Sequence, residues 1–333
     1  MTVLTGAPAL DVDGLSVDIR TPAGTVRAVD GVSFGARSGR TLALLGESGC
    51  GKSLTAQALV GLLEPVASVA GGAVRLGDTD LVTAGRSVRR RLAGPGLAIV
   101  FQDALTALNP VYTVGTQLAE PFRIHQGMSR KAARAEAVRL MARVGIPSPE
   151  TRVDAYPHQF SGGMRQRLLI AMAVALNPAV LLADEPTTAL DVTVQAQIMQ
   201  LLRELRTERN MAVVLITHDL ALVAEEADDV VVMYAGTVVE AGPVAEVFAH
   251  PHHPYTRGLL DSVPAGTPKG TELASIGGSP PELHKIPASC VYQDRCPLVR
   301  ERCRAERPAV RSSGERRVAC HFAEELGFEG AIA

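Results

Sequence analysis

The segment with the clearest chemical meaning is a glycine-rich loop spaced like a phosphate-binding site. Residues 46–53 read GESGCGKS and fit G-x-x-x-x-G-K-[ST]. Glycines there let backbone N–H groups turn toward phosphate oxygens, and a following helix adds a favourable dipole. A chance glycine-rich turn is the alternative, but an apolar strand precedes the loop and a helical pattern follows it. The predicted nucleotide-binding residues are Gly46, Glu47, Ser48, Gly49, Cys50, Gly51, Lys52 and Ser53.

Two of these residues carry most of the expected chemistry. Lys52 should reach the β- and γ-phosphates, and the hydroxyl of Ser53 should ligate Mg²⁺. Cys50 occupies a variable position of the pattern, so a small filler is the favoured interpretation for it.

A second chemical feature is an acidic pair at the end of a short apolar run. Residues 180–185 read VLLADE. A buried strand of this kind would place Asp184 beside the phosphate loop, where it holds Mg²⁺ directly or through water. Glu185 could then polarise the attacking water as a general base. Two acids opening a turn before Pro186 are the alternative, which the phosphate loop disfavours.

Alternating strand and helix patterns indicate how these residues are positioned. Short apolar strands separated by helices predict a mostly parallel sheet covered on both faces, so the fold class is α/β. The block from about 102 to 176 is almost entirely helical and reads as an insertion. Strands are expected at 41–45, 97–101, 180–183 and 212–216, helices at 53–63, 129–144, 164–176 and 192–209, and hairpins at 10–34 and 230–240.

Composition excludes several function classes. Lys and Arg (33) nearly balance Asp and Glu (35), Trp is absent and aromatics make up 4%, so no nucleic-acid partner is expected. The N-terminus has neither the basic nor the apolar region of a secretory signal. The best candidate for a membrane span, residues 168–183, is interrupted by Asn177 and Pro178. Any membrane role would therefore need partner subunits.

A series of motifs in one order resembles the ATPases of ABC transporters. FSGGM at 160–164 is similar to the family's signature, usually Leu-Ser-Gly-Gly-Gln. Gln102 resembles the Q-loop glutamine, Asp191 lies in a segment like the D-loop, and His218 resembles the switch histidine. With the phosphate loop and the acidic pair, these motifs cover residues from about 10 to 250. The resemblance implies a P-loop ABC cassette: a RecA-like core, an antiparallel β subdomain and a helical subdomain.

The resemblance also implies a role for each motif. In the family, backbone N–H groups around Ser161, Gly162 and Gly163 cap the γ-phosphate of ATP bound by the opposite subunit. Two such proteins then close head-to-tail around two nucleotides. Gln102 would sense Mg²⁺ and the attacking water, and His218 would hold Glu185 in place. Magnesium would thus be held by Ser53, Gln102 and Asp184.

Two positions depart from the family pattern. The signature glutamine is Met164 here, which removes one polar contact. The aromatic residue that stacks on adenine in the family corresponds to Ile19, and no Phe or Tyr occurs near it before Phe34. The sequence therefore contains all the residues expected to bind the phosphates, whereas the expected contact with adenine is only apolar.

Longer segments resemble the D-type ATPase of the oligopeptide/dipeptide importer group. They are FQDALTALNPVYTVG at 101–115, YPHQ at 156–159, MRQR at 164–167, HPYTRGLL at 253–260 and GSPP at 278–281. The resemblance implies an ATP-binding domain at 1–261, with its helical subdomain at about 103–176, and a C-terminal extension at 262–333.

The same resemblance implies partners and a location. Two membrane permeases, a second F-type ATPase forming a heterodimer and, indirectly, an extracytoplasmic binding protein are expected, with the chain at the cytoplasmic face of the membrane. Asn109, Pro110 and Tyr112 are candidates for contact with the permeases, although a capped loop before the next helix is an equal alternative. The transported solute is expected to be a di- or oligopeptide, with nickel or another solute as alternatives.

Four cysteines gather near the C-terminus: Cys290, Cys296, Cys303 and Cys320. Without an export signal, disulfides explain the cluster poorly. Four thiolates suit Zn²⁺ or a [4Fe–4S] cluster, and the close C-x₂₋₄-C pair typical of zinc is absent. Members of the importer group with this pattern can hold a [4Fe–4S] cluster, which is therefore favoured over zinc and over unligated thiols.

Two other function classes remain as alternatives. A soluble ABC ATPase acting on DNA or ribosomes would normally carry tandem cassettes or long coiled-coil insertions, and neither is present. An exporter cassette would lack the C-terminal extension and the importer-like segment after Gln102.

Overall fold

A nine-stranded sheet forms the centre of the protein in a computed structural model that describes residues 8–102, 107–188, 190–263, 275–327 and 331–332. The strand order is β13-β11-β12-β10-β9-β3-β8-β7-β6. Neighbours from β9 to β6 run parallel, and the remaining pairs are antiparallel. The core strands are β3 (Thr41–Leu45), β6 (Leu97–Val100), β7 (Val180–Asp184), β8 (Ala212–Thr217), β9 (Asp229–Tyr234) and β10 (Thr237–Pro243).

The parallel strands are apolar because both of their faces are covered. Every residue of β3, β7 and β8 is buried, as expected for strands between layers of helices. Parallel strands end at the same edge of the sheet. Consequently the phosphate loop after β3, the acidic pair at the end of β7 and His218 after β8 are brought to one edge.

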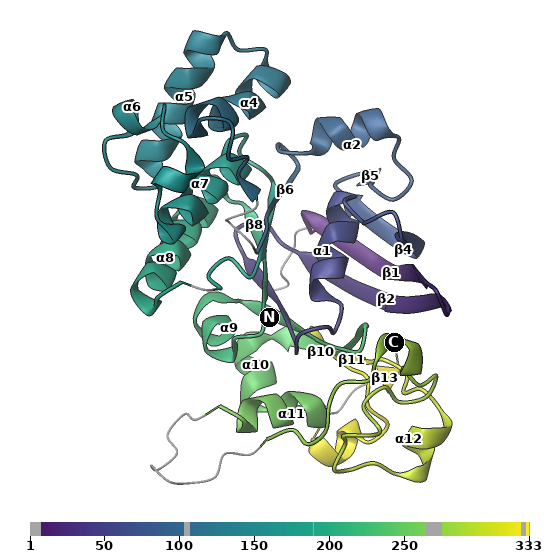
Figure 1. Cartoon of the computed structure of the whole chain (residues 1–333). Coiled ribbons are helices and arrows are strands. Elements are labelled where there is room, and N and C mark those ends of the chain that lie inside the picture. The colour runs from purple at the N-terminus through teal and green to yellow at the C-terminus, as the bar shows by residue number, and fades with distance from the viewer. Residues whose placement is uncertain (1–7, 103–106, 189, 264–274, 328–330, 333) are drawn as a thin grey trace.

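A second, antiparallel sheet lies beside the core, at the right of Figure 1. Its order is β2-β1-β4-β5, and β1 and β2 form the predicted hairpin, in which Thr21 pairs with Gly24. The elements of this lobe are β1 (Leu10–Thr21), β2 (Gly24–Ala36), β4 (Ala67–Leu76) and β5 (Thr79–Asp80), followed by α2 (Arg86–Leu92). Helix α1 (Lys52–Val60) follows the phosphate loop and lies between this lobe and the core.

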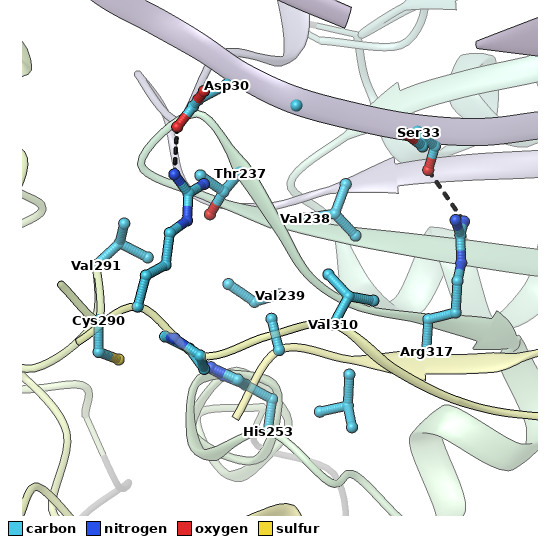
Figure 2. Close-up of a pocket in the computed structure, with 15 residues that line it drawn as sticks. Asp30, Ser33, Thr237, Val238, Val239, His253, Cys290, Val291, Val310 and Arg317 are labelled. Carbon is cyan, nitrogen blue, oxygen red and sulfur yellow. Dashed lines mark hydrogen bonds and ion pairs between the residues drawn. The ribbon is translucent and has the colours of Figure 1, made fainter. Parts of the chain in front are cut away.

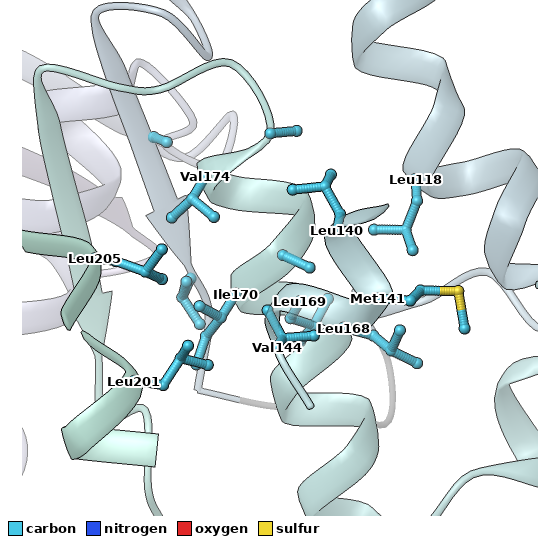
Figure 3. Close-up of a cluster of buried hydrophobic side chains, with 14 of the residues drawn as sticks. Leu118, Leu140, Met141, Val144, Leu168, Leu169, Ile170, Val174, Leu201 and Leu205 are labelled. Carbon is cyan, nitrogen blue, oxygen red and sulfur yellow. The ribbon is translucent and has the colours of Figure 1, made fainter. Parts of the chain in front are cut away.

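A helical lobe occupies the opposite side of the molecule (Figure 1). Side chains of Thr113 and Ser129 accept hydrogen bonds from backbone N–H groups at the starts of two of its helices, which satisfies otherwise unpaired donors. Leucine, valine and methionine side chains from four helices meet in one buried cluster, shown in Figure 3. The cluster draws on α4 (Val114–Gln126), α5 (Arg130–Arg143), α7 (Gly162–Val174) and α8 (Val192–Arg209). The short helix α6 (Pro149–Arg152) and the 3-10 turn η1 (Pro157–Gln159) lie between α5 and α7 in the chain.

The C-terminal residues continue the core sheet. Strand β12 pairs with β10, and the buried Arg316 donates to Glu240 across this pairing at 2.8 Å. The elements are α9 (Leu220–Glu226), α10 (Val244–Ala249), α11 (Pro254–Asp261), η2 (Leu283–Lys285), α12 (Glu301–Ala305), β11 (Arg311–Ser313), β12 (Arg316–Val318), η3 (Ala323–Leu326) and β13 (Ala331–Ile332). Within the described ranges, no helix combines the length and the apolar character needed to cross a membrane.

The predicted fold class is confirmed, and most predicted elements occur close to their expected bounds. Helix α1 ends earlier than predicted, because Gly61 adopts φ 70° and caps it. The pattern did not indicate α2 or β4, whose faces are mostly exposed or half-buried.

The helical lobe should depend on Leu168, which is fully buried on α7 within the cluster of Figure 3. Leu168→Ala is expected to destabilise the protein by about 2–5 kcal/mol, because it removes buried methyl groups and leaves a cavity. Val192→Ala, at a side chain that is 83% exposed, is the matched control and should change stability by less than about 0.5 kcal/mol. Urea unfolding of both variants measures the difference, and equal midpoints would contradict this packing.

Candidate functional site at the edge of the core sheet

The phosphate loop curls around its own lysine. The Nζ of Lys52 is buried and donates to the carbonyl oxygens of Gly46 at 2.7 Å and Glu47 at 3.0 Å. Gly46 cannot be replaced without strain, because a Cβ atom there would lie 2.3 Å from the carbonyl oxygen of Met233 in β9. Ser48 and Gly49, at the loop tip, are exposed. The tip of the loop therefore faces solvent, while its first residue, Gly46, packs against the core sheet.

Cys50 and Gly51 complete the loop. The Cys50 side chain is only 3% exposed, and burial raises the pKa of its thiol. Its sulfur lies 3.8 Å from Lys52 Nζ. The carbonyl of Cys50 accepts from the N–H of Gly236 at 2.9 Å, and Gly51 packs against Ala28. These contacts describe a packing role for Cys50.

Ser53 and Asp184 meet at the sheet edge. The Ser53 hydroxyl donates to Asp184 Oδ1 at 3.2 Å, although the two residues are 131 positions apart. Burial raises the pKa of Asp184, and the hydrogen bond from Ser53 only partly offsets this effect. A buried carboxylate and a hydroxyl are oxygen donors of the type that Mg²⁺ prefers, and a cation there would favour the ionised carboxylate. The donor set therefore fits magnesium.

Glu185 lies at the centre of the site. Its Oε1 accepts from Nδ1 of His218 at 2.9 Å, and its Oε2 accepts from Nε2 of Gln102 at 2.8 Å and from Oγ1 of Thr188 at 2.9 Å. The backbone of Glu185 has φ 45°, which is uncommon for a residue other than glycine. Its N–H donates to the carbonyl of Ile216 in β8 at 2.9 Å, which holds this conformation.

The surroundings of Glu185 keep it ionised. Burial alone raises its pKa, but the hydrogen bonds from His218 and Thr188, with the nearby Lys52 charge, outweigh burial and leave the pKa below its usual value. A carboxylate of this kind is unprotonated at neutral pH and can accept a proton from water. The structure thus brings together the three residues predicted as catalytic and adds Thr188. The hydroxyl three positions after the acid was the sequence signal for Thr188.

The signature segment begins a helix on the other lobe. Ser161 is the N-cap of α7, and its Oγ accepts from the N–H of Met164 at 3.4 Å. A Cβ atom at Gly163 would lie 2.6 Å from Val194 of α8, so α7 and α8 approach closely there. Asp191 caps α8 by accepting from the N–H of Val194 at 2.9 Å. In Figure 1, α7 belongs to the helical lobe and stands apart from α1, which begins with Lys52.

The two departures from the family pattern both pack within the fold. The sulfur of Met164 accepts from Arg152 at 3.5 Å, and the side chain is half-buried. Ile19 is half-buried in β1, where it pairs with Val26 and Ala67. Residues 103–106 after Gln102, and Ala189 beside Asp191, lie outside the described residues.

Comparison with known proteins identifies the family. The profile of the ABC transporter family matches residues 29–188, and the profile described as oligopeptide/dipeptide transporter, C-terminal region, matches residues 239–303. Dipeptide transport ATP-binding protein DppD of Escherichia coli (strain K12) is 46% identical over 314 residues, covering 94% of this chain and 96% of that protein. The chain belongs to the ABC transporter ATP-binding family. It is therefore an ABC ATPase.

Other relatives agree with this assignment. DppD of Bacillus subtilis (strain 168) is 50% identical over 289 residues, 86% of each chain. A putative peptide import ATP-binding protein of Brucella abortus (strain 2308) is 48% identical over 321 residues, 96% of this chain and 97% of that protein.

Solved ABC cassettes share the fold. A dimeric bacterial ABC transporter cassette aligns with TM-score 0.63 and 25% identity over 71% of this chain and 98% of its own. The protein cbiO1 from Clostridium perfringens, part of the ABC transporter complex cbiONQ, aligns with TM-score 0.61 and 28% identity over 73% of this chain and 92% of its own.

The four C-terminal cysteines of this ABC ATPase line one small cavity. Cys290, Cys296, Cys303 and Cys320 surround a space of about 20 Å³. Burial raises the pKa of Cys290 and of Cys296 to about 11. Across the described residues, no three Cys, His, Asp or Glu side chains are arranged to hold a metal ion. Four thiols can ligate a soft metal or a cluster once they are deprotonated, and burial favours the protonated form of Cys290 and Cys296.

The hydrogen bonds to Glu185 predict a shift in the pH profile of ATP hydrolysis. Thr188→Val removes one hydrogen-bond donor at nearly constant volume. Burial, which raises the pKa of Glu185, is then offset less, so this pKa should rise. Since a lowered pKa keeps the carboxylate ionised to lower pH, the acid limb of kcat/KM should move to higher pH in the variant, with little change on the alkaline side. Thr207→Val, on the exposed face of α8, is the control. An unshifted acid limb would show that Glu185 does not titrate in this step.

Proposed function

We propose that this chain is the ATP-hydrolysing subunit of an ABC importer for di- or oligopeptides. The observation that carries the proposal is similarity over nearly the whole length to proteins named for dipeptide transport and peptide import. The match to the oligopeptide/dipeptide transporter C-terminal profile supports the same substrate class, since it covers residues that the ABC transporter profile does not match.

In the proposed reaction, the loop and sheet edge of this chain bind ATP and activate water. Backbone N–H groups of residues 46–53 and the Lys52 ammonium hold the phosphates. Ser53, Asp184 and Gln102 would hold Mg²⁺, which would neutralise phosphate charge when bound. Glu185 accepts a proton from the attacking water, and His218 and Gln102 orient its carboxylate. Ile19 provides an apolar contact for the base.

The site needs a second subunit. Ser161, Gly162, Gly163 and Met164 lie at the start of α7, and in Figure 1 α7 belongs to the helical lobe and stands apart from α1, which begins with Lys52 of the phosphate loop. The helix that starts there offers N–H groups suited to an anion. We infer head-to-tail closure, in which this signature caps ATP on the partner ATPase, an F-type subunit, and the partner's signature caps ATP here. Asp191 would lie at the same interface.

A groove between the two lobes fits the permease contact. It is mainly apolar, has a volume of about 400 Å³ and is lined by residues of α1, α4 and α7 and by strand β6. Leu62 and Ile124, on its walls, are 56% and 54% exposed. Such exposed apolar side chains favour burial against another protein, and a short amphipathic helix from a cytoplasmic permease loop fits this shape.

The candidate contact residues Asn109, Pro110 and Tyr112 remain part of this proposal. The Asn109 side chain accepts from the N–H of Val111 at 3.1 Å, which caps the loop, and the Tyr112 side chain is 55% exposed. A capped loop and a contact surface are therefore compatible there.

The proposed setting is the cytoplasmic face of the membrane. Two permeases would form the path, and an extracytoplasmic binding protein would deliver the peptide. The proposed domain division keeps residues 1–261, which end with α11, as the ATP-binding domain, with the helical subdomain at about 103–176 and the extension at 262–333.

Glu185→Gln tests the proposed function directly. The amide cannot accept the proton, so hydrolysis should fall by at least about 100-fold, while ATP binding and assembly with the permeases persist. Uptake of a labelled dipeptide into proteoliposomes should fall in parallel. Thr207→Val, an exposed substitution on α8, is the control: it is purified in the same way and should keep wild-type hydrolysis and uptake. Wild-type uptake in the Glu185→Gln variant would reject Glu185 as the general base. No dipeptide uptake by the wild-type complex, or a chain that purifies without any membrane protein, would overturn the importer assignment; uptake of nickel in place of dipeptide would correct the substrate.

We further propose that Cys290, Cys296, Cys303 and Cys320 hold a structural [4Fe–4S] cluster, with Zn²⁺ as the alternative occupant. The convergence of four thiols on one cavity supports this assignment. The cluster would tie the extension together and takes no part in hydrolysis.

Anaerobically purified protein should be brown, with visible absorbance and about four irons per chain. Cys296→Ser should lose the colour, whereas Cys50→Ser, which changes the thiol outside the cluster, should keep it. Metal analysis decides between the occupants: a colourless protein with stoichiometric zinc would reject the iron–sulfur assignment.

A further inference from the structure

We propose that Arg295 of the C-terminal extension is a positioning residue of the ATP site, which neutralises Glu47 of the phosphate loop so that the loop can bind a polyanion. The proposal rests on the assignment of residues 46–53 as the ATP phosphate site. Arg295 Nη1 donates to Glu47 Oε2 at 2.6 Å, and Nη2 donates to Oε1 at 3.0 Å. This two-pronged pair joins residues 248 positions apart.

Arg295 is held firmly in this position. Its side chain is only 4% exposed, whereas that of Glu47 is 29% exposed. Its Nε donates to the carbonyl of Gly277 at 2.9 Å, and its guanidinium lies 5.7 Å from the ring centre of Tyr234. The hydrogen bonds to Glu47 raise the pKa of Arg295. A planar guanidinium fixed on several sides loses little freedom when it pairs with a carboxylate.

A second contact fixes the backbone of the same loop residue. The N–H of Glu47 donates to Oη of Tyr255 at 3.0 Å. Tyr255 packs against Tyr234 and Tyr292, with ring centres 4.7 Å and 5.4 Å away. Burial raises the pKa of Tyr255, so its hydroxyl remains protonated. Side chain and backbone of Glu47 are therefore both set by residues outside the loop.

The charge of Glu47 explains why this matters. A carboxylate in a loop that surrounds the phosphates of ATP repels them, and the repulsion is strong where water is partly excluded. Arg295 cancels that charge at hydrogen-bond distance. The binding site for ATP phosphates is therefore completed by a residue from outside the ABC cassette proper.

The extension is anchored well enough to keep Arg295 in place. Arg307 pairs with Asp30 of β2, and Arg317 donates to the carbonyl of Ser33 at 3.0 Å. Figure 2 shows Asp30, Ser33 and Arg317 around the cavity between the extension and the core, which has a volume of about 230 Å³. Arg295 also directly precedes Cys296, so the conformation of the cysteine segment affects where Arg295 meets the phosphate loop.

Variants of the full-length chain test this inference through ATP affinity. Arg295→Gln should raise the Kd for Mg²⁺–ATP by about tenfold, because it leaves the Glu47 charge uncompensated. The double variant Glu47→Gln with Arg295→Gln removes both charges and should return the Kd to within about twofold of wild type. In the assembled transporter, KM for ATP should rise for Arg295→Gln while kcat changes by less than about twofold.

Three controls separate the explanations. Arg300→Gln removes an exposed arginine that pairs with Glu325 in the same extension and should leave the Kd unchanged. Arg295→Lys keeps the charge but loses the two-pronged geometry, and it covers the case in which Arg295→Gln fails to fold; its Kd should lie between those of wild type and Arg295→Gln. Lys52→Ala should abolish ATP binding.

The outcomes are distinct. No rescue in the double variant, or a Kd for Arg295→Lys at least as high as that for Arg295→Gln, would overturn the charge argument and leave Arg295 as a structural residue. If Lys52→Ala still binds ATP normally, the assignment of the phosphate loop itself fails. If Lys52→Ala loses binding and Arg295→Gln does not, only the role of Arg295 is rejected.

Discussion

The site depends on one constraint: the carboxylate of Glu185 must stay ionised at the edge of a buried parallel sheet. Burial raises the pKa of such a carboxyl group, and hydrogen bonds from His218 and Thr188 reverse the effect. Its donors come from three separate places in the chain, after β6, after β7 and after β8. Only a parallel arrangement of these strands brings their ends together, so the chemistry at Glu185 is a consequence of the sheet order.

The helical lobe and the C-terminal part of the chain act on this edge from two sides. Helix α7, which Ser161 caps, belongs to the helical lobe and stands apart from α1, which begins with Lys52; this separation favours a site completed by another subunit. Tyr255 of α11 and Arg295 of the extension both contact Glu47 of that loop. In the proposed arrangement, the core holds the phosphates of ATP, the signature acts on a partner and the extension sets the charge of the loop.

The sequence predicted the local features well because each has a short-range pattern. The phosphate loop, the apolar strand before Asp184 and the capped helix after Ser129 are read from neighbouring residues, and the structure contains all three. The pair of Glu47 with Arg295 spans 248 positions, and no local pattern signals it. The hydrogen bond from Thr188 to Glu185 has a local signal, a hydroxyl three positions after the acid, but that signal is weak because a hydroxyl in a turn has many ordinary uses. The [4Fe–4S] cluster at the four cysteines stays a prediction, because four thiols can bind either iron–sulfur or zinc and the fold alone does not choose between them.

The most direct test of this account is a structure of the assembled transporter carrying Glu185→Gln with Mg²⁺–ATP. The decisive measurement is the distance from Ser161 Oγ to the γ-phosphate held by the other ATPase's phosphate loop. The account predicts hydrogen-bond distance, about 2.5–3.2 Å, with the substituted amide side chain at position 185 facing the γ-phosphate of its own site. A closed, ATP-bound pair in which Ser161 touches no phosphate, or only ATP bound to its own chain, would contradict it.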